Sequence, residues 1–302
     1  MLGVGAISFQ GTTKRYGNLR ALNDLRLEVA EGEIFGFLGL NGAGKTTAIR
    51  VLLDLLRPTA GKASIFGHDC QSDGLKARSN IGYLPGEMGI YADLTGREVL
   101  NLLARLNGRA LDTKLRRQLQ DRLDLPDRDL RRRLREYSTG MKRKLGLIQA
   151  FEGDPLLLIL DEPTEGLDPL MQQAFYELLA DTKRRARTVF MSSHVLSEVE
   201  RVCDRIALLR KGEMVLLTAV EESRRLGPRR VRVFFSEDVI STPGLTAGSK
   251  IVEASPRMWN LEVEGLLGPF LKAISALPVQ DLEVEESKLE DVLMKYYREG
   301  GQ

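Results

Sequence analysis

One segment near the N-terminus limits most tightly what this chain can fold into. Residues 33–38 read EIFGFL, the pattern of a buried strand, and GLNGAGKT follows at Gly39–Thr46. A helical pattern then runs over Thr46–Leu56 until Arg57-Pro58, where proline cannot extend a helix. A strand, a glycine-rich turn and a helix in this order predict a phosphate-binding loop in an α/β fold.

Each residue type in this loop has a physical use. Glycines let backbone N–H groups turn inward around phosphate oxygens, and the following helix adds the positive end of its dipole. Lys45 supplies a point charge to the β- and γ-phosphates, and the Thr46 hydroxyl is placed to bind Mg²⁺. The residues expected to bind the nucleotide here are Gly39, Leu40, Asn41, Gly42, Ala43, Gly44, Lys45, Thr46 and Thr47.

A second apolar run ends in two acids. Leu156–Leu160 is followed by Asp161 and Glu162, so a buried strand delivers two carboxylates to the carboxyl edge of the sheet. Ligands of open α/β folds bind at that edge. We expect Asp161 to hold Mg²⁺ through water and Glu162 to act as the general base for the water that attacks the γ-phosphate.

Other patterns extend the same α/β arrangement. Residues 96–152 lack strand patterning and predict three or four helices, and Asp168-Pro169 predicts a helix start with an N-cap and a proline at the first helical position. Further short strands are expected at Ile7–Gln10, Leu25–Val29, Ala63–Phe66, Ile81–Leu84 and Thr188–Ser192. Strands alternating with helices favour a largely parallel sheet.

The pattern changes after about residue 217. Val231, Val233 and Phe235 alternate with outward-facing neighbours, as do Trp259, Leu261 and Val263, so two half-buried strands are expected. The other elements expected here are a helical connector over Ala219–Arg230, a helix near Leu267–Leu277, a strand at Leu282–Val284 and a closing helix over Leu289–Tyr297. Together they predict a small α+β domain.

Composition excludes several classes of protein. The 44 Lys+Arg against 42 Asp+Glu leave a net charge of +2, which gives no strong field toward nucleic acid. Cys70 and Cys203 lie far apart, which disfavours a disulfide scaffold or zinc site and favours a reducing compartment. The longest uninterrupted apolar stretch, Ile34–Leu40, is far shorter than the roughly 18 residues that a membrane-spanning helix needs. The N-terminus has no basic residue ahead of its apolar stretch, so we expect no signal peptide.

With both sites in place, further motifs resemble those of the ATP-binding cassette (ABC) ATPases. The match is to the nucleotide-binding subunits of bacterial exporters of drugs, antibiotics or lipids. The run YSTGM at Tyr137–Met141 resembles a variant of the family signature LSGGQ, and Gly166-Leu167-Asp168 resembles the D-loop. His194 resembles the switch histidine, and Tyr16 stands where the family places an adenine-stacking aromatic. Order and spacing match across roughly residues 5–220.

The resemblance implies a fold and a set of roles. It implies a P-loop NTPase (ABC cassette) domain at 1–220 with a helical subdomain inserted at about 88–152, and an accessory α+β domain at 221–302. It implies ATP and Mg²⁺ as cofactors, with Lys45, Glu162 and His194 catalytic. It also implies that Ser138, Gly140 and Asp168 bind the nucleotide held by a second subunit in a head-to-tail dimer.

The partners follow from the same resemblance. They are a second copy of the chain or a homologous subunit, and integral membrane permeases contacted through the helical segment 88–152, at the cytoplasmic face of the membrane. No nucleic acid is expected. The C-terminal domain is expected to regulate or to contact the dimer.

The sequence departs from the family pattern at one position of chemical weight. The family usually has glutamine after the strand that corresponds to Ile81–Leu84, and here Gly86 stands there. Either Glu87, a backbone group or water takes over that contact, or turnover is less tightly coupled. Leu40, Thr139 and Met141 are milder departures.

Two alternative functions stay open. One is a soluble ABC ATPase that acts on ribosomes or DNA, but such relatives carry two cassettes or long coiled coils, which this chain lacks. The other is a nucleotide-gated scaffold that does not hydrolyse ATP, as Gly86 suggests. Asp161, Glu162 and His194 count against that reading.

Overall fold

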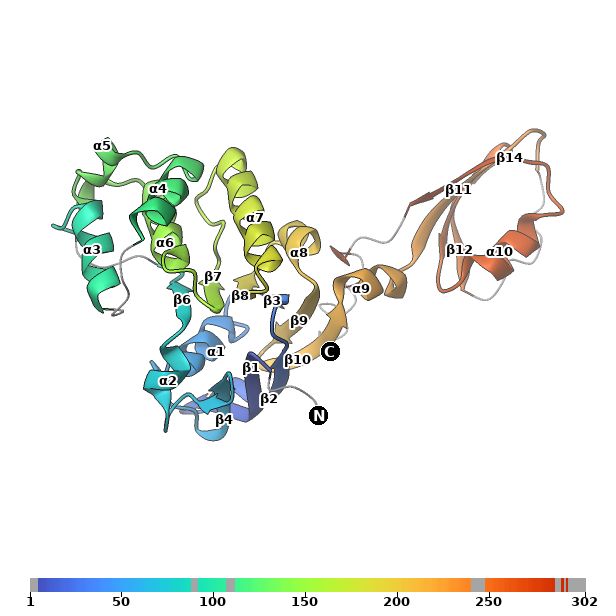
Figure 1. Ribbon diagram of the computed structural model, residues 1–302. Coiled ribbons are helices and arrows are strands. Elements are labelled where there is room, and N and C mark those ends of the chain that lie inside the picture. The colour runs from blue at the N-terminus through green and yellow to red at the C-terminus, as the bar shows by residue number, and fades with distance from the viewer. Residues whose placement is uncertain are drawn as a thin grey trace. The chain divides into compact units, whose positions relative to one another are not determined.

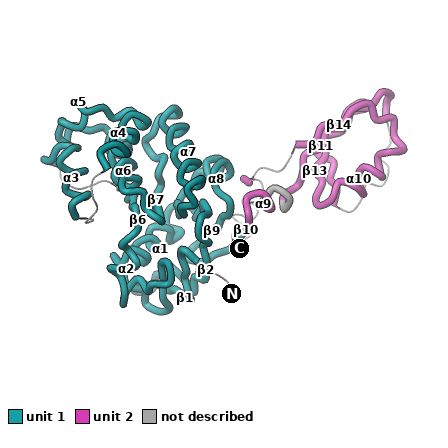
Figure 2. Tube along the Cα trace, in the orientation of Figure 1, with its two compact units in different colours: residues 1–217 teal, residues 218–302 magenta. Residues whose placement is uncertain are grey.

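The computed structural model describes residues 5–87, 92–106, 112–239, 248–285, 289–290 and 292, without the side chains of 224–226. The chain forms two compact units, residues 1–217 and 218–302, which Figure 2 shows in different colours. None of the helices in the described ranges is both long enough and apolar enough to cross a bilayer.

The larger sheet of the first unit has six strands and lies among its helices (Figure 1). Its order is β10-β9-β3-β8-β7-β6, and β3 pairs in parallel with both β8 and β9, as β7 does with β6 and β8. The strands are β3 (Ile34–Leu38), β6 (Ile81–Leu84), β7 (Leu157–Asp161), β8 (Thr188–Ser193), β9 (Arg205–Arg210) and β10 (Glu213–Ala219). Every residue of β3, β7 and β8 is buried, as in parallel sheets covered on both faces.

A smaller antiparallel sheet belongs to the same unit, in the order β2-β1-β4-β5. Its strands are β1 (Ile7–Tyr16), β2 (Leu19–Val29), β4 (Ala60–Ile65) and β5 (His68–Asp69). The predicted strands Ile7–Gln10 and Leu25–Val29 were too short, because a Gly17-Asn18 turn joins β1 and β2 into one hairpin. The residues next to that turn are exposed, so they show no alternation of apolar and polar positions.

Helices cover the first unit. They are α1 (Lys45–Leu52), α2 (Gly74–Arg78), α3 (Gly96–Leu106), α4 (Thr113–Arg122), α5 (Asp127–Leu130), the 3-10 turn η1 (Leu134–Glu136), α6 (Thr139–Phe151), α7 (Pro169–Arg184) and α8 (Leu196–Val202). The first of them ends at Leu52 rather than Leu56, because Asp54 takes a left-handed backbone with φ of 56°. Where three or four helices were predicted over residues 96–152, the described residues form the four α-helices α3 to α6 and the 3-10 turn η1.

The second unit is a four-stranded antiparallel sheet in the order β12-β13-β11-β14 with helix α10 (Figure 1). Its elements are α9 (Val220–Leu226), β11 (Arg229–Phe235), β12 (Ser249–Ser255), β13 (Met258–Val263), α10 (Leu267–Ile274) and β14 (Val279–Glu285). Trp259 and Phe235 pack edge-on at the centre of its core, with ring centroids 4.7 Å apart.

Several predictions for this second unit need correction. The connector is helical only to Leu226, since Arg229 and Arg230 already belong to β11. Strand β12 was missed, because most of its residues are exposed. Helix α10 stops at Ile274 rather than Leu277, and β14 is longer than Leu282–Val284. The closing helix lies outside the described residues except at Leu289, Glu290 and Val292.

Candidate nucleotide site

The glycine-rich turn after β3 is shaped by close backbone approach. Gly44 has a φ of 112°, and a Cβ there would lie 2.3 Å from the carbonyl oxygen of Ala21, so only glycine fits. No side chain caps α1, which begins directly after Gly44. The free N–H groups at this helix start are what an anion such as phosphate binds.

The Lys45 ammonium is buried beside the turn. Its side chain is 6% exposed, and its Nζ donates to the carbonyl oxygen of Gly39 at 2.5 Å. The same Nζ lies 3.2 Å from Oε1 of Glu162. The carbonyl oxygen of the turn and the Glu162 carboxylate together satisfy this buried cation.

Asp161 ends β7 with its side chain almost fully buried. Thr46 Oγ1 donates to Oδ2 of Asp161 at 3.2 Å, so the two oxygen ligands expected for the metal lie side by side. Across the described residues, no group of three or more His, Cys, Asp or Glu side chains could hold a metal ion. One carboxylate and one hydroxyl fit Mg²⁺, which is bound by few protein oxygens together with substrate phosphates and water.

Ser192 is a site residue that sequence reasoning missed. Its Oγ donates to Oδ1 of Asp161 at 2.5 Å and accepts from the backbone N–H of Glu162 at 3.1 Å. The signal was the register of parallel strands, because β8 ends beside β7 and pairs Ser192 with Asp161. A polar residue at the end of the neighbouring strand could therefore have been flagged.

Glu162 and His194 meet at the mouth of the site. His194 Nδ1 lies 2.8 Å from Oε2 of Glu162, whose other carboxylate oxygen faces Lys45. The backbone of Glu162 has a φ of 50°, an uncommon conformation for a residue other than glycine. The structure thus brings together the predicted residues Lys45, Thr46, Asp161, Glu162 and His194.

Outside this cluster lie four further predicted residues, Ser138, Gly140, Asp168 and Tyr16. Ser138 and Asp168 are N-caps, since Ser138 Oγ accepts from Met141 N–H at 3.2 Å and Asp168 Oδ1 from Met171 N–H at 3.0 Å. Gly140 lies in the first turn of α6 against Gly166, where a Cβ would come within 2.8 Å of the Gly166 carbonyl. Tyr16 ends β1 with half of its surface exposed and Lys14 Nζ over its ring.

An open cleft of about 910 Å³ lies at Thr46, Glu162 and His194. It runs from Asn41 and Thr46 past Glu162 and His194 to Thr139 on α6. This volume lies in the range of small-molecule sites. Gly86 and Glu87 line it too, and a Cβ on Gly86 would lie 3.3 Å from Asp161 Oδ2.

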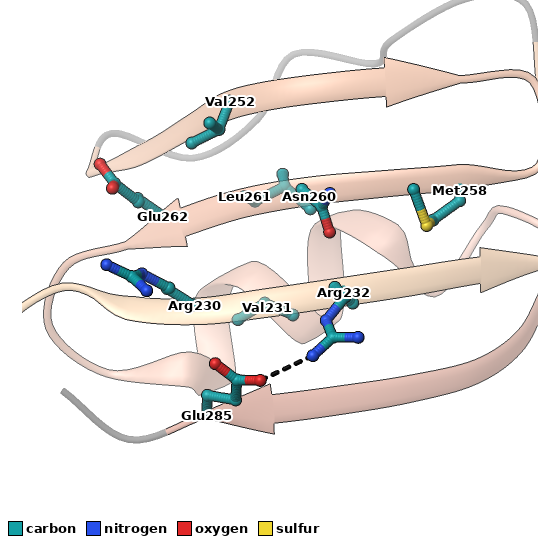
Figure 3. A pocket seen from close by; sticks show the side chains of 9 residues that line it. All are labelled: Arg230, Val231, Arg232, Val252, Met258, Asn260, Leu261, Glu262 and Glu285. Carbon is teal, nitrogen blue, oxygen red and sulfur yellow. Dashed lines mark hydrogen bonds and ion pairs between the residues drawn. The ribbon is translucent and has the colours of Figure 1, made fainter. Parts of the chain in front are cut away.

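A second hollow, of about 440 Å³, lies on the sheet of the second unit (Figure 3). Two of its charged side chains, Arg232 and Glu285, pair across strands, as the dashed line in Figure 3 marks, and the contact measures 2.6 Å. Residues 218–302 contain no histidine or cysteine. The cleft of the first unit therefore remains the candidate site.

Comparison with known proteins gives the family. The family described as "ABC transporter" matches residues 22–165. An uncharacterized ABC transporter ATP-binding protein of Nostoc sp. is 40% identical over 67% of this chain, which spans only 61% of that relative. The bacitracin transport ATP-binding protein BcrA of Enterococcus faecalis is 34% identical over 85% of this chain and 81% of its own length.

Solved structures agree with the fold. An ATP-binding subunit of an ABC transporter superposes with a TM-score of 0.67 at 31% identity, covering 73% of this chain and 92% of that one. The dimeric bacterial cassette MJ0796 has a TM-score of 0.63 at 23% identity, over 71% of this chain and 98% of that one. The predicted α/β cassette fold is thus confirmed, and the chain belongs to the ATP-binding proteins of ABC transporters.

Proposed function

We propose that this chain is the ATP-hydrolysing subunit of an ABC exporter, working as a dimer with Mg²⁺ on separate membrane permease subunits. The proposal rests on the position of the Glu162 carboxylate, which lies 3.2 Å from Lys45 Nζ and 2.8 Å from His194 Nδ1. A carboxylate fixed between a phosphate-binding cation and a histidine is oriented as a general base for water.

The residues divide the chemistry among them. Glu162 takes a proton from the attacking water while the bond between the β,γ-bridging oxygen and the γ-phosphorus breaks, which gives ADP and phosphate. Lys45 and the N–H groups of Gly39–Thr46 stabilise the phosphate charge. His194 fixes the direction of the Glu162 carboxylate.

The Thr46 hydroxyl and the Asp161 carboxylate are the groups that would hold Mg²⁺. The ion supplies charge neutralisation at the β- and γ-phosphates when bound. Ser192, through its hydrogen bond to Asp161, keeps one carboxylate oxygen aimed at that position.

The dimer and the transport role rest on likeness. MJ0796 is described as a dimeric cassette, and BcrA as a bacitracin transport protein. In the proposed dimer, Ser138, Gly140 and Asp168 of one copy would contact the nucleotide in the cleft of the other. Tyr16, exposed at the end of β1, would stack on the adenine. The permeases would place the chain at the cytoplasmic face of the membrane.

Glu162→Gln tests the proposal. We expect the steady-state rate of ATP hydrolysis to fall about 1,000-fold, as for loss of a positioned base, while ATP binding persists and an ATP-bound dimer accumulates. Glu177→Gln, on the exposed face of α7, is the matched control and should hydrolyse ATP normally. Full hydrolysis in Glu162→Gln would remove this residue from the role of base.

Capture of the chain from native membranes tests the partner. We expect a protein with several membrane spans to co-purify in an ATP-dependent manner. Recovery of ribosomes or DNA instead would favour the soluble alternative.

A further inference from the structure

One buried arginine lines the cleft but has no role in the proposed mechanism. Arg143 lies on α6, one helical turn after Ser138–Gly140, with only 5% of its side chain exposed. It forms an ion pair with the Glu165 carboxylate at 3.7 Å, and Glu165 is itself mostly exposed. A guanidinium buried to this degree needs other partners for its N–H groups.

Those partners are backbone carbonyls of three different segments. Nη1 and Nη2 donate to the carbonyl oxygens of Pro85 and Gly86 at 2.9 and 2.8 Å. Nη1 also reaches the carbonyl oxygen of Asp161 at 3.4 Å, and Nε that of Glu165 at 3.2 Å. The flat fork of arginine suits this arrangement, because its donors point in several fixed directions.

Each of the three segments belongs to the candidate site. Pro85 and Gly86 follow β6 and line the cleft next to Asp161, the expected metal ligand. Asp161 is followed by Glu162, the proposed base. Glu165 lies in the loop that leads to Asp168, and in that loop Gly166 packs directly against Gly140.

We propose that Arg143 is a positioning residue that ties the Ser138–Gly140 segment to the Asp161-Glu162 edge and to the loop at Gly86. The inference rests on the proposed function, because it requires that Ser138–Gly140 serves the nucleotide of a second copy. A movement of the Ser138–Gly140 segment is then transmitted through Arg143 to Glu162, the proposed general base. At Gly86, where no side chain can reach the site, Arg143 fixes the loop through its backbone.

Two variants in the full-length chain test this role. Arg143→Gln removes the charge and most donors, and Arg143→Lys keeps the charge but has a single nitrogen that cannot span four carbonyls. For both we expect kcat for ATP to fall about 10- to 100-fold, as for loss of groups that orient a catalytic site. The Kd for ATP, set by the glycine-rich turn, should stay within a factor of about two.

Arg116→Gln is the matched control for loss of a buried arginine. Arg116 is also buried, but its contacts are Glu152 and Asn101, away from the cleft. Arg116→Gln should lower the melting temperature at least as much as Arg143→Gln does, while kcat stays unchanged. If kcat in Arg143→Gln and Arg116→Gln instead falls in step with the loss of melting temperature, Arg143 has only a structural role.

A second readout addresses the Ser138–Gly140 end. In the Glu162→Gln background, which should trap the ATP-bound dimer, adding Arg143→Gln should reduce dimer formation at saturating ATP at least tenfold. An undiminished dimer, or full kcat in Arg143→Lys, would overturn the positioning role. Absence of ATP hydrolysis in the unmodified chain would overturn the proposed function itself, so the two failures are distinguishable.

Discussion

The parallel sheet of the first unit and the antiparallel sheet of the second use charge in opposite ways. Strands β3, β6, β7 and β8 contain one charged residue, Asp161, buried at the carboxyl end of β7. In the second unit Arg232 pairs with Glu283 and Glu285 across an exposed sheet face. Exposed pairs are screened by water and contribute little, whereas a buried charge persists only where specific groups satisfy it.

The comparison separates a site from a solvated surface. At the strand ends of the first unit, each buried charged group has a defined partner: Lys45 has Glu162, and Asp161 has Thr46 and Ser192. On the second sheet, the ion pairs of Arg232 are exposed, so water competes with them. Chemistry is therefore expected in the first unit and packing in the second.

The largest expected effect concerns the core of the second unit. Phe235→Ala removes the ring that meets Trp259 edge-on, and should lower the free energy of unfolding of this unit by about 3–5 kcal/mol. Trp259 is the single tryptophan of the chain, so its fluorescence in a urea titration reports on this unit. Leu266→Ala, at an exposed position, serves as control. An equal loss of ATP binding in Phe235→Ala would contradict the division between the two units.

Lys45→Ala should have the next largest effect, on the first unit alone. It removes the buried cation at the glycine-rich turn, and we expect ATP hydrolysis to fall about 100- to 1,000-fold with a clear loss of nucleotide affinity. Titration with a fluorescent ATP analogue measures the affinity, with the exposed Lys76→Ala as control. Unchanged binding would remove the turn from its assigned role.

Ser192→Ala should have a smaller effect that is specific to the metal. Without its hydroxyl, Asp161 loses an orienting hydrogen bond, and the Mg²⁺ concentration for half-maximal hydrolysis should rise about tenfold. Ser193→Ala is the neighbouring control, because the Ser193 hydroxyl contacts Val195 and Glu198 instead. If both variants respond alike to Mg²⁺, Ser192 does not act through Asp161.

Arg232→Gln should have the smallest effect. Its ion pairs with Glu283 and Glu285 are exposed, so we expect no resolvable change in the urea midpoint followed by Trp259 fluorescence. A midpoint that drops as far as in Phe235→Ala would show that charge on this face matters as much as the core.

What could be predicted from sequence follows the range of the interactions. The glycine-rich turn, β7 with its two acids and the helix start at Asp168 are encoded within a few residues, and the structure has them at these positions. Ser192 and Arg143 were missed, because their partners are distant in the sequence. Asp161 lies 31 residues from Ser192, and Gly86 lies 57 residues from Arg143. Such contacts depend on strand order, which no local pattern contains. Strand β12 was missed for a different reason, since its exposed side chains carry little hydrophobic signal.

The left-handed backbone of Glu162 lowers the stability of the fold at the residue that the proposed ATP hydrolysis needs. A residue other than glycine held in that conformation costs of order 1 kcal/mol or more, and the fold tolerates this where the carboxylate is needed. Glycine at 162 would relieve the strain and remove the proposed base in one substitution. Selection of this chain for heat resistance alone would therefore favour variants that bind ATP firmly and no longer consume it.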